Sequence, residues 1–416
     1  MTPIRRLLSN KDFVSFVLLR LFLTLGIQMQ MSTISLQIYY EYTKDELMLG
    51  LIGLAEAIPF ILVSFYSGYL ADKVNRKLII YLGAITLLIT ALFLVLFTEK
   101  TFLFFHNKPM WVLYFVVVIF GINRAFMAAA MQPFLTEILP RELYTYSASL
   151  NSGAWHLGAI LGPVFSGFIY SWKTNGALLN YITVAFLYSA SIMCLLIIKH
   201  KGKKIEQQNT SSNNLLESIK EGITFVKQSK ILFGAITLDL FAVLFGGVSA
   251  IIPAFTDKIL HLGPEYYGLL RTSPAIGALV MSLLLSFYLP TKNAGKVLMY
   301  SVALFGVFTI LFGISRNYWI AFWMLFLTGV FDSVSVVIRH SILQLYTPDH
   351  LRGRVTAING IFIGSSNEIG AFESGLAARL MGLTASIIFG GSMTILIVYL
   401  IFRSNKELMK LDLSKV

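Results

Sequence analysis

The chain has 416 residues, of which 56% are hydrophobic and only 13% are charged, and its mean hydropathy is +0.74. A soluble domain is usually about 45–50% apolar and about 25% charged, so this composition excludes an ordinary soluble enzyme, a disordered tail and a fibrous protein. Cys194 is the only cysteine, which excludes an intrachain disulfide and a zinc site built from several cysteines. The formal net charge of +12 suggests nucleic acid or a membrane surface as a partner, and the positions of the charges decide between them.

Twelve segments are apolar over the roughly 20 residues that a transmembrane helix requires. In chain order they are residues 13–40, 47–70, 78–98, 110–135, 145–170, 180–198, 231–255, 267–289, 297–315, 319–344, 355–380 and 384–402. The polar residues before the first segment carry no small-residue cleavage site, so we expect no signal peptide. The predicted fold class is an all-α polytopic membrane protein.

The basic residues indicate how these spans are oriented. With the N-terminus inside, 22 of the 33 Lys and Arg residues fall in inside segments and 6 fall in outside loops. Such a bias is the positive-inside signal of membrane proteins, and basic inside segments also contact anionic lipid. An even number of spans then places both termini in the cytoplasm. The basic excess therefore reports topology, and we expect no nucleic-acid partner.

The longest polar segment, residues 199–230, follows the sixth span and predicts a cytoplasmic linker. Its second part is amphipathic at helical spacing, which indicates a helix lying on the membrane or on the bundle. The apolar positions are Leu215, Leu216, Ile219, Ile223 and Val226. The predicted organisation is a six-helix bundle over residues 1–198, the linker over 199–230 and a second six-helix bundle over 231–416.

The two predicted bundles resemble each other in sequence. A shift of 219 residues places Arg20–Phe22 on Asp239–Phe241, and a shift of 208 residues places Gly121 and Gly162 on Gly329 and Gly370. The order of the matches and their nearly constant offset favour a duplicated six-helix unit. Duplicated membrane halves hold substrate between them near the midplane and rock about that site.

A loop between the second and third spans resembles the signature of the major facilitator superfamily. The segment Gly68-Tyr-Leu-Ala-Asp72-Lys-Val-Asn75-Arg76-Lys77 is similar to G-x-L-A-D-[RK]-x-G-R-[RK]. Asn75 stands where Gly is usual, and we expect it to keep the turn because Asn tolerates a left-handed backbone. The resemblance implies a conformational latch made by Gly68, Asp72, Arg76 and Lys77, in which the charges engage a neighbouring helix end. The alternative is a solvated turn whose charges only set topology.

The fifth span resembles the antiporter motif of the same superfamily. The segment runs Gly158-Ala-Ile-Leu-Gly162-Pro163-Val-Phe-Ser166-Gly167, and Ser166 stands where a second Gly is common. Glycines spaced in this way let helices approach closely. Within the superfamily the motif favours export, while ordinary small-residue packing is the alternative.

Further segments resemble the enterobactin-exporter and macrolide-efflux-like branch of drug:proton antiporters. They are Gly53–Pro59, Leu238–Gly247, Leu351–Val355 and Ser365–Gly375. This resemblance implies the twelve-helix major facilitator fold, two pseudo-symmetric bundles and no cofactor. It also implies a proton-driven exporter of amphipathic small molecules, a siderophore or a drug, in the bacterial inner membrane. We expect a monomer surrounded by membrane lipids.

Ionisable side chains inside spans are candidate functional groups because they are costly in a membrane. The repeat aligns Arg20 with Asp239 and Arg124 with Asp332. We hypothesise that these opposite charges neutralise one another across or beside a cavity, and that a proton on either aspartate biases the rocking equilibrium. The alternative is static pairs that only hold helices together.

Five other charges lie within or near the spans, and one of them is Glu56 in span two. Glu368 and Glu373 in span eleven, with nearby serines and Asn367, predict one polar patch that binds cargo, carries protons or bonds helices together. Arg339, near the inner end of span ten, is predicted to snorkel to the interface. Glu137, near the inner end of span four, is interpreted as an interface residue.

The sequence has no Walker loop, HExxH, G-x-S-x-G or dinucleotide motif in a supporting context, so we expect neither an ATP-driven pump nor an enzyme, and no metal site. Two alternatives to a proton-coupled exporter stay open: a lysophospholipid or lipid carrier of the same fold, and a non-transporting membrane receptor. The sequence does not distinguish a proton from Na⁺ as the coupling ion.

Overall fold

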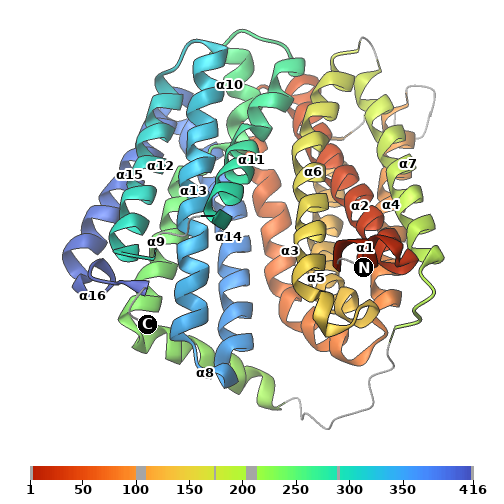
Figure 1. Cartoon of the computed structure of the whole chain (residues 1–416). Coiled ribbons are helices and arrows are strands. Elements are labelled where there is room, and N and C mark those ends of the chain that lie inside the picture. Colours follow the sequence, from red (N-terminus) through yellow and green to blue (C-terminus); the bar gives the residue numbers. More distant parts are fainter. Residues whose placement is uncertain (1–2, 100–108, 173–174, 203–212, 288–290, 414–416) are drawn as a thin grey trace. The chain divides into compact units, whose positions relative to one another are not determined.

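The computed structural model describes residues 3–99, 109–172, 175–202, 213–287 and 291–413, and these residues form helices and no strands. They divide into two compact units. Unit 1 comprises residues 1–44, 55–207 and 261–272, and unit 2 comprises 45–54, 208–260 and 273–416. Each unit is a bundle of long helices (Figure 1).

The helices of unit 1 follow the predicted spans closely. They are α1 (Pro3–Ser9), α2 (Lys11–Gln37), most of α3 (Glu46–Lys73), α4 (Arg76–Thr98), α5 (Trp111–Ile138), α6 (Tyr144–Tyr170) and α7 (Gly176–Ile197). A π-helical segment, Ile38–Tyr42, continues α2 to the end of the first span.

The helices of unit 2 include the linker helix and the remaining spans. They are α8 (Asn213–Gln228), α9 (Lys230–Gly246), α10 (Ile252–Lys258), most of α11 (Pro264–Phe287), α12 (Ala294–Ile314), α13 (Tyr318–Tyr346), α14 (Asp349–Met381), α15 (Leu383–Ser404) and α16 (Lys406–Met409).

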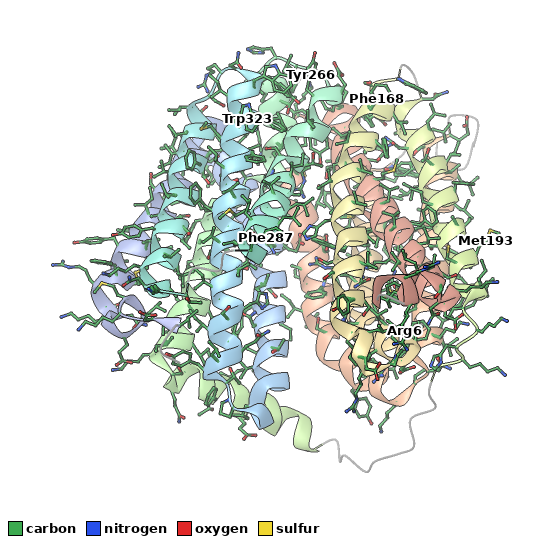
Figure 2. All side chains as sticks on the ribbon, viewed as in Figure 1. Arg6, Phe168, Met193, Tyr266, Phe287 and Trp323 are labelled. Carbon is green, nitrogen blue, oxygen red and sulfur yellow. The ribbon has the colours of Figure 1, made fainter. Side chains whose placement is uncertain are left out.

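Among the described residues, ten segments are long and apolar enough to cross a membrane. The two other predicted spans correspond to α6, with 27 residues, and α14, with 33 residues, which carry more polar side chains. The exposed side chains elsewhere are largely apolar. Figure 2 shows Met193 of α7 at an edge of its bundle, where an exposed apolar side chain suits contact with lipid tails.

The core of unit 1 is organised around α2, whose closest neighbours are α6 and α7. Leu19 and Leu23 are buried in its centre. Polar side chains also pair inside this bundle: Tyr188 donates to Gln30 Oε1 at 2.7 Å, and the hydroxyls of Thr33 and Ser166 lie 2.9 Å apart. Because lipid offers no hydrogen bonds, these internal pairs satisfy the polar groups of the spans.

Span seven is not the continuous helix that was predicted over residues 231–255. The helix α9 ends at Gly246, a 3₁₀ turn covers Ser249–Ile251, and α10 begins at Ile252. Two successive glycines, Gly246 and Gly247, stand at the break, where their conformational freedom favours an irregular backbone. Ser374 of α14 donates to the Gly247 carbonyl at 2.6 Å and so satisfies a backbone group at the break.

The linker helix predicted from its apolar spacing is present as α8. Val226 is buried in the core of unit 2, so this end of α8 packs on the bundle. The side chains of Leu215, Leu216 and Ile219 lie outside the described residues.

The first residues of two helices, α3 and α11, belong to a different unit from the rest of those helices. The first residues of α3, 45–54, belong to unit 2, where Gly50 lies against Gly375 of α14. In the same unit, Lys258 Nζ lies 2.6 Å from Glu46 Oε1 and Arg379 forms an ion pair with Asp45. Residues 261–272 belong to unit 1, where Gly268 lies against Gly167 of α6.

Candidate functional site

A cluster of three charges, two of them buried, lies between α9 and α13 in unit 2. Arg339 forms an ion pair with Asp239, and its Nη2 lies 4.0 Å from Asp332 Oδ1. Asp332 precedes Arg339 by seven residues on α13, which places both on one side of that helix. The side chains of Arg339 and Asp239 are each 8% exposed, whereas that of Asp332 is 43% exposed. With all three groups ionised the cluster carries one net negative charge.

Arg339 does not snorkel to the interface, so that prediction is wrong. Its side chain is buried because Asp239 offers a carboxylate within the bundle. A paired charge inside a protein avoids much of the cost of an isolated one. The hypothesis paired Asp239 and Asp332 with Arg20 and Arg124, but the described ion pairs of both aspartates are with Arg339 of their own unit.

In unit 1, Arg124 of α5 forms an ion pair with Glu56 of α3. The guanidinium also lies 4.8 Å from the centroid of the Phe60 ring, at a distance typical of a cation–π contact. Glu56 is buried, whereas the Arg124 side chain is 31% exposed. The sequence singled out Glu56 as a charge within a span but could not identify its partner, because the pairing depends on how α3 and α5 are rotated.

Arg20 of α2 is another charge within a span of unit 1. Its Nε atom is buried and has no hydrogen-bond partner, and Arg20 forms no ion pair with another described residue. Since Arg124 is balanced by Glu56, this uncompensated guanidinium leaves the set of Arg20, Arg124 and Glu56 with one net positive charge.

The polar residues of α14 do not form the single patch that was predicted. Ser366 and Ser374 are buried, Asn367 is exposed, and Glu368 and Glu373 are partly buried, so these side chains lie on several faces of the helix. Their roles also differ, since Ser374 bonds to the break in span seven. Glu373 forms no ion pair with the described part of the chain.

The loop between α3 and α4 makes hydrogen bonds to the backbone of the residues that follow α7. Asn75 donates to the Lys201 carbonyl at 2.6 Å, and Lys77 donates to the Ile198 carbonyl. Arg76 donates to Glu137 of α5 at 2.6 Å. The Gly68 Cα faces open space, and the Asp72 side chain lies outside the described residues.

One expectation about this loop is wrong. Asn75 has φ −56°, so it is not left-handed; instead its side chain caps α4 by accepting from the Lys77 amide at 2.9 Å. Asn is a favoured cap because its short side chain reaches the free amides of a first turn. Glu137 also lies 3.6 Å from His200 Nε2, so it contacts both this loop and the residues that follow the sixth span.

We expect Glu137→Gln to lower the stability of unit 1 by about 1–3 kcal/mol, because it removes the carboxylate from a mostly buried, charge-assisted contact with Arg76. The buried thiol of Cys194 lies in the same unit, so a thiol-reactive dye reports unfolding on heating. Glu142→Gln is the matched control, since Glu142 is exposed and lies 3.8 Å from an exposed Arg6. Equal melting temperatures for the two variants would contradict the expectation.

The glycines of the fifth span lie at close helix contacts. A Cβ atom on Gly158 would lie 2.8 Å from Thr24 Cβ, and one on Gly162 would lie 3.1 Å from the Leu25 carbonyl oxygen, both on α2. A Cβ atom on Gly167 would lie 2.8 Å from the Pro264 carbonyl oxygen. Pro163 lies inside α6 between these contacts. Side chains larger than hydrogen would force α6 away from its neighbours.

Comparison with known families decides the classification of this fold. The family model of the major facilitator superfamily matches residues 16–371 and 240–414. The chain belongs to the major facilitator superfamily. The predicted family and fold class are therefore confirmed.

Relatives of this superfamily member are named for efflux or for transport. It is 23% identical over 377 residues to macrolide efflux protein A of Streptococcus pyogenes, covering 90% of this chain and 91% of that protein. It is 24% identical over 363 residues to the staphyloferrin A transporter of Staphylococcus aureus, covering 86% and 88%. The multidrug efflux pump Tap of Mycolicibacterium fortuitum is 21% identical over 84% of the chain and 85% of its own length.

Solved structures of the superfamily share the fold. A nucleoside transporter, NupG, matches with a TM-score of 0.73 and 12% identity over 95% of this chain and 99% of its own. A D-xylose–proton symporter matches with the same TM-score and 13% identity over 96% and 99%. This superfamily member is thus a multi-pass membrane transporter of small molecules with efflux-type relatives, and it is not an enzyme.

Proposed function

We propose that this chain is a proton-driven exporter of amphipathic small molecules, a siderophore or a drug, that works by alternating access. In this proposal residues 1–198 and 231–416 are the two functional halves and residues 199–230 connect them. The protein acts as a monomer in the bacterial inner membrane, surrounded by membrane lipids, with both termini in the cytoplasm. The relatives that are named for macrolide and multidrug efflux support export.

One observation carries the proposal of proton coupling: a single arginine lies beside two aspartates whose side chains differ in exposure. Arg339 neutralises the buried Asp239, while Asp332 lies farther from Arg339 and is 43% exposed. The surplus negative charge therefore resides at the group that a proton or a ligand can reach. A charge of this kind within a membrane span is costly unless it is neutralised.

Either a proton or a cationic group of the cargo can neutralise Asp332, and the two compete for one carboxylate. Competition for one site is sufficient to exchange cargo for protons, provided that each ligand favours a different access state. Arg20, Arg124 and Glu373 are proposed as further charges of the cavity, and Glu368 as a residue that binds cargo or protons beside Glu373.

Two other groups are proposed to serve the conformational change rather than binding. Gly68, Asp72, Arg76 and Lys77 form the latch, and the contact from Arg76 to Glu137 supports this role because it joins the loop to α5. Gly158, Gly162, Pro163 and Gly167 provide the close packing of α6, which sets how far it can approach α2.

The proposal is tested with purified protein in liposomes that contain a pH-sensitive dye. A proton gradient is imposed, and ethidium or a carboxylate siderophore is added as cargo. We expect cargo-dependent proton flux in the wild type and a loss of at least about tenfold in Asp332→Asn, because a neutral amide cannot exchange a proton. Asp239→Asn should also impair transport, since it leaves Arg339 to draw Asp332 into a closer pair.

A matched control removes a carboxylate that is far from the cluster in sequence. Glu221→Gln changes an exposed residue of α8 and should keep the wild-type flux. Full cargo-dependent proton flux in both aspartate variants would contradict the coupling role. Transport that follows an imposed Na⁺ gradient and ignores the proton gradient would replace the proton with Na⁺.

A further inference from the structure

An apolar groove with a volume of 440 Å³ lies in unit 2 between α11, α12 and α13. Its size falls in the range of about 300–1,000 Å³ that is usual for ligand pockets. Leu285, Ser301 and Val334 are buried and form its floor. Leu284, Tyr300 and Leu304 are exposed and form its rim. The exposed rim means that the groove opens on the outer surface of the helices, where a membrane protein contacts lipid.

The groove extends inward from one end of α12. This helix begins at Ala294, and its lining residues run from Val297 to Leu304. At 1.5 Å per residue they lie between roughly 5 and 15 Å from the start of the helix. In the predicted topology this end of α12 faces the cytoplasm, so the groove has the depth of the inner leaflet. An acyl chain of that leaflet is the apolar molecule at this depth.

Two lysines stand at the cytoplasmic end of the groove. Lys296 precedes Tyr300 by one turn on the same side of α12, and Lys292 lies just before the helix. Both side chains are exposed, and neither forms an ion pair with another described residue. Their position fits a phosphate in the headgroup layer, with the attached chain running into the groove. Anionic lipids of the cytoplasmic leaflet attract lysines placed in this way.

We propose that this groove binds one acyl chain of an anionic phospholipid, whose phosphate contacts Lys292 and Lys296. The site is separate from the charge cluster of the proposed transport mechanism and does not depend on which cargo is carried. Phe331 lines the groove and stacks on Phe308 with ring centroids 5.5 Å apart, and Asp332 is the next residue of α13. The bound lipid therefore contacts the helix that carries the exposed aspartate.

The test uses the full-length protein in vesicles that contain phosphatidylglycerol with a photoreactive diazirine in one acyl chain. After illumination, mass spectrometry locates the labelled peptides. We expect label in the peptides of α11, α12 and α13 that line the groove. Val297→Trp, which places an indole in the groove, should reduce this label at least fivefold. Leu396→Trp adds the same ring at an exposed site on α15 and should leave the label unchanged.

The headgroup assignment is tested with phosphatidylcholine that carries the same photoreactive chain. We expect phosphatidylglycerol to label the groove about 5- to 30-fold more strongly, and the double variant Lys292→Gln/Lys296→Gln to bring that ratio close to one. Lys227→Gln/Lys406→Gln removes two exposed charges elsewhere in unit 2 and should keep the wild-type ratio.

Two results would overturn the proposal. Equal labelling of the groove in Val297→Trp and in the wild type would show that the chain lies elsewhere. A preference for phosphatidylglycerol that survives the substitution of both lysines would remove the headgroup contact. If Val297→Trp aggregates on gel filtration, Leu304→Trp fills the groove from its rim and provides the same measurement.

Discussion

Replacing Arg339 with Met should destabilise unit 2 by about 3–5 kcal/mol, because it leaves the Asp239 carboxylate buried without its cation. The ion pair between them is almost fully shielded, with each side chain 8% exposed. Asp332 contributes little to this loss of stability, because it lies 4.0 Å from Arg339 and is the weaker of the two partners. We therefore expect the loss to come from Asp239.

The measurement requires a thiol that reports on unit 2. Ser386 is buried on α15, so Ser386→Cys in a Cys194→Ser background provides a single buried thiol there. Its labelling by a thiol-reactive dye on heating gives the melting temperature. The double variant Asp239→Asn/Arg339→Met removes both charges and should recover more than half of the loss. Equal melting of the single variant and the wild type would contradict the expectation.

The second large effect is expected where α12 and α15 meet through glycines. A Cβ atom on Gly306 would lie 2.8 Å from the Gly391 carbonyl oxygen, and one on Gly391 would lie 2.6 Å from the Gly306 carbonyl oxygen. The obstacle in both cases is backbone, which cannot rotate aside as a side chain can. Gly306→Leu should therefore force the helices apart and lower stability by about 1–3 kcal/mol or more.

A glycine in open space provides the control for this substitution. A Cβ atom on Gly360 of α14 would meet nothing within 4 Å. We therefore expect Gly360→Leu to change the free energy of unfolding by no more than about 0.5 kcal/mol and to melt close to the wild type. Both variants are measured with the thiol at position 386. If Gly306→Leu melts no earlier than Gly360→Leu, the close packing of α12 on α15 is not what stabilises this part of unit 2.

The positions of the helices could be predicted from the sequence because hydropathy is a local property of the chain. The predicted segment 145–170 matches α6 and the segment 384–402 lies within α15. The break in span seven was missed although Gly246 and Gly247 mark it, because glycine is common in membrane helices and does not by itself end one.

The pairing of charges could be predicted only in part. The sequence shows that Asp332 and Arg339 share a side of one helix, since they are seven residues apart. It does not show that α9 presents Asp239 to the same guanidinium, because that depends on the rotation and packing of two helices. Membrane depth alone then favours snorkelling for Arg339, and the partner that keeps it buried is visible only in three dimensions.

The break in span seven also changes how a disturbance travels along it. A displacement at one end of a continuous helix moves its other end. Span seven instead consists of two helices, α9 and α10, that are separated by a break at Gly247, and a hydrogen bond from Ser374 connects this break to α14. Asp239 lies on α9, eight residues before Gly247. If a change of charge at Asp239 shifts α9, the chain can bend at Gly247 while α10 stays in place. The shift can also move α14 through the hydrogen bond from Ser374.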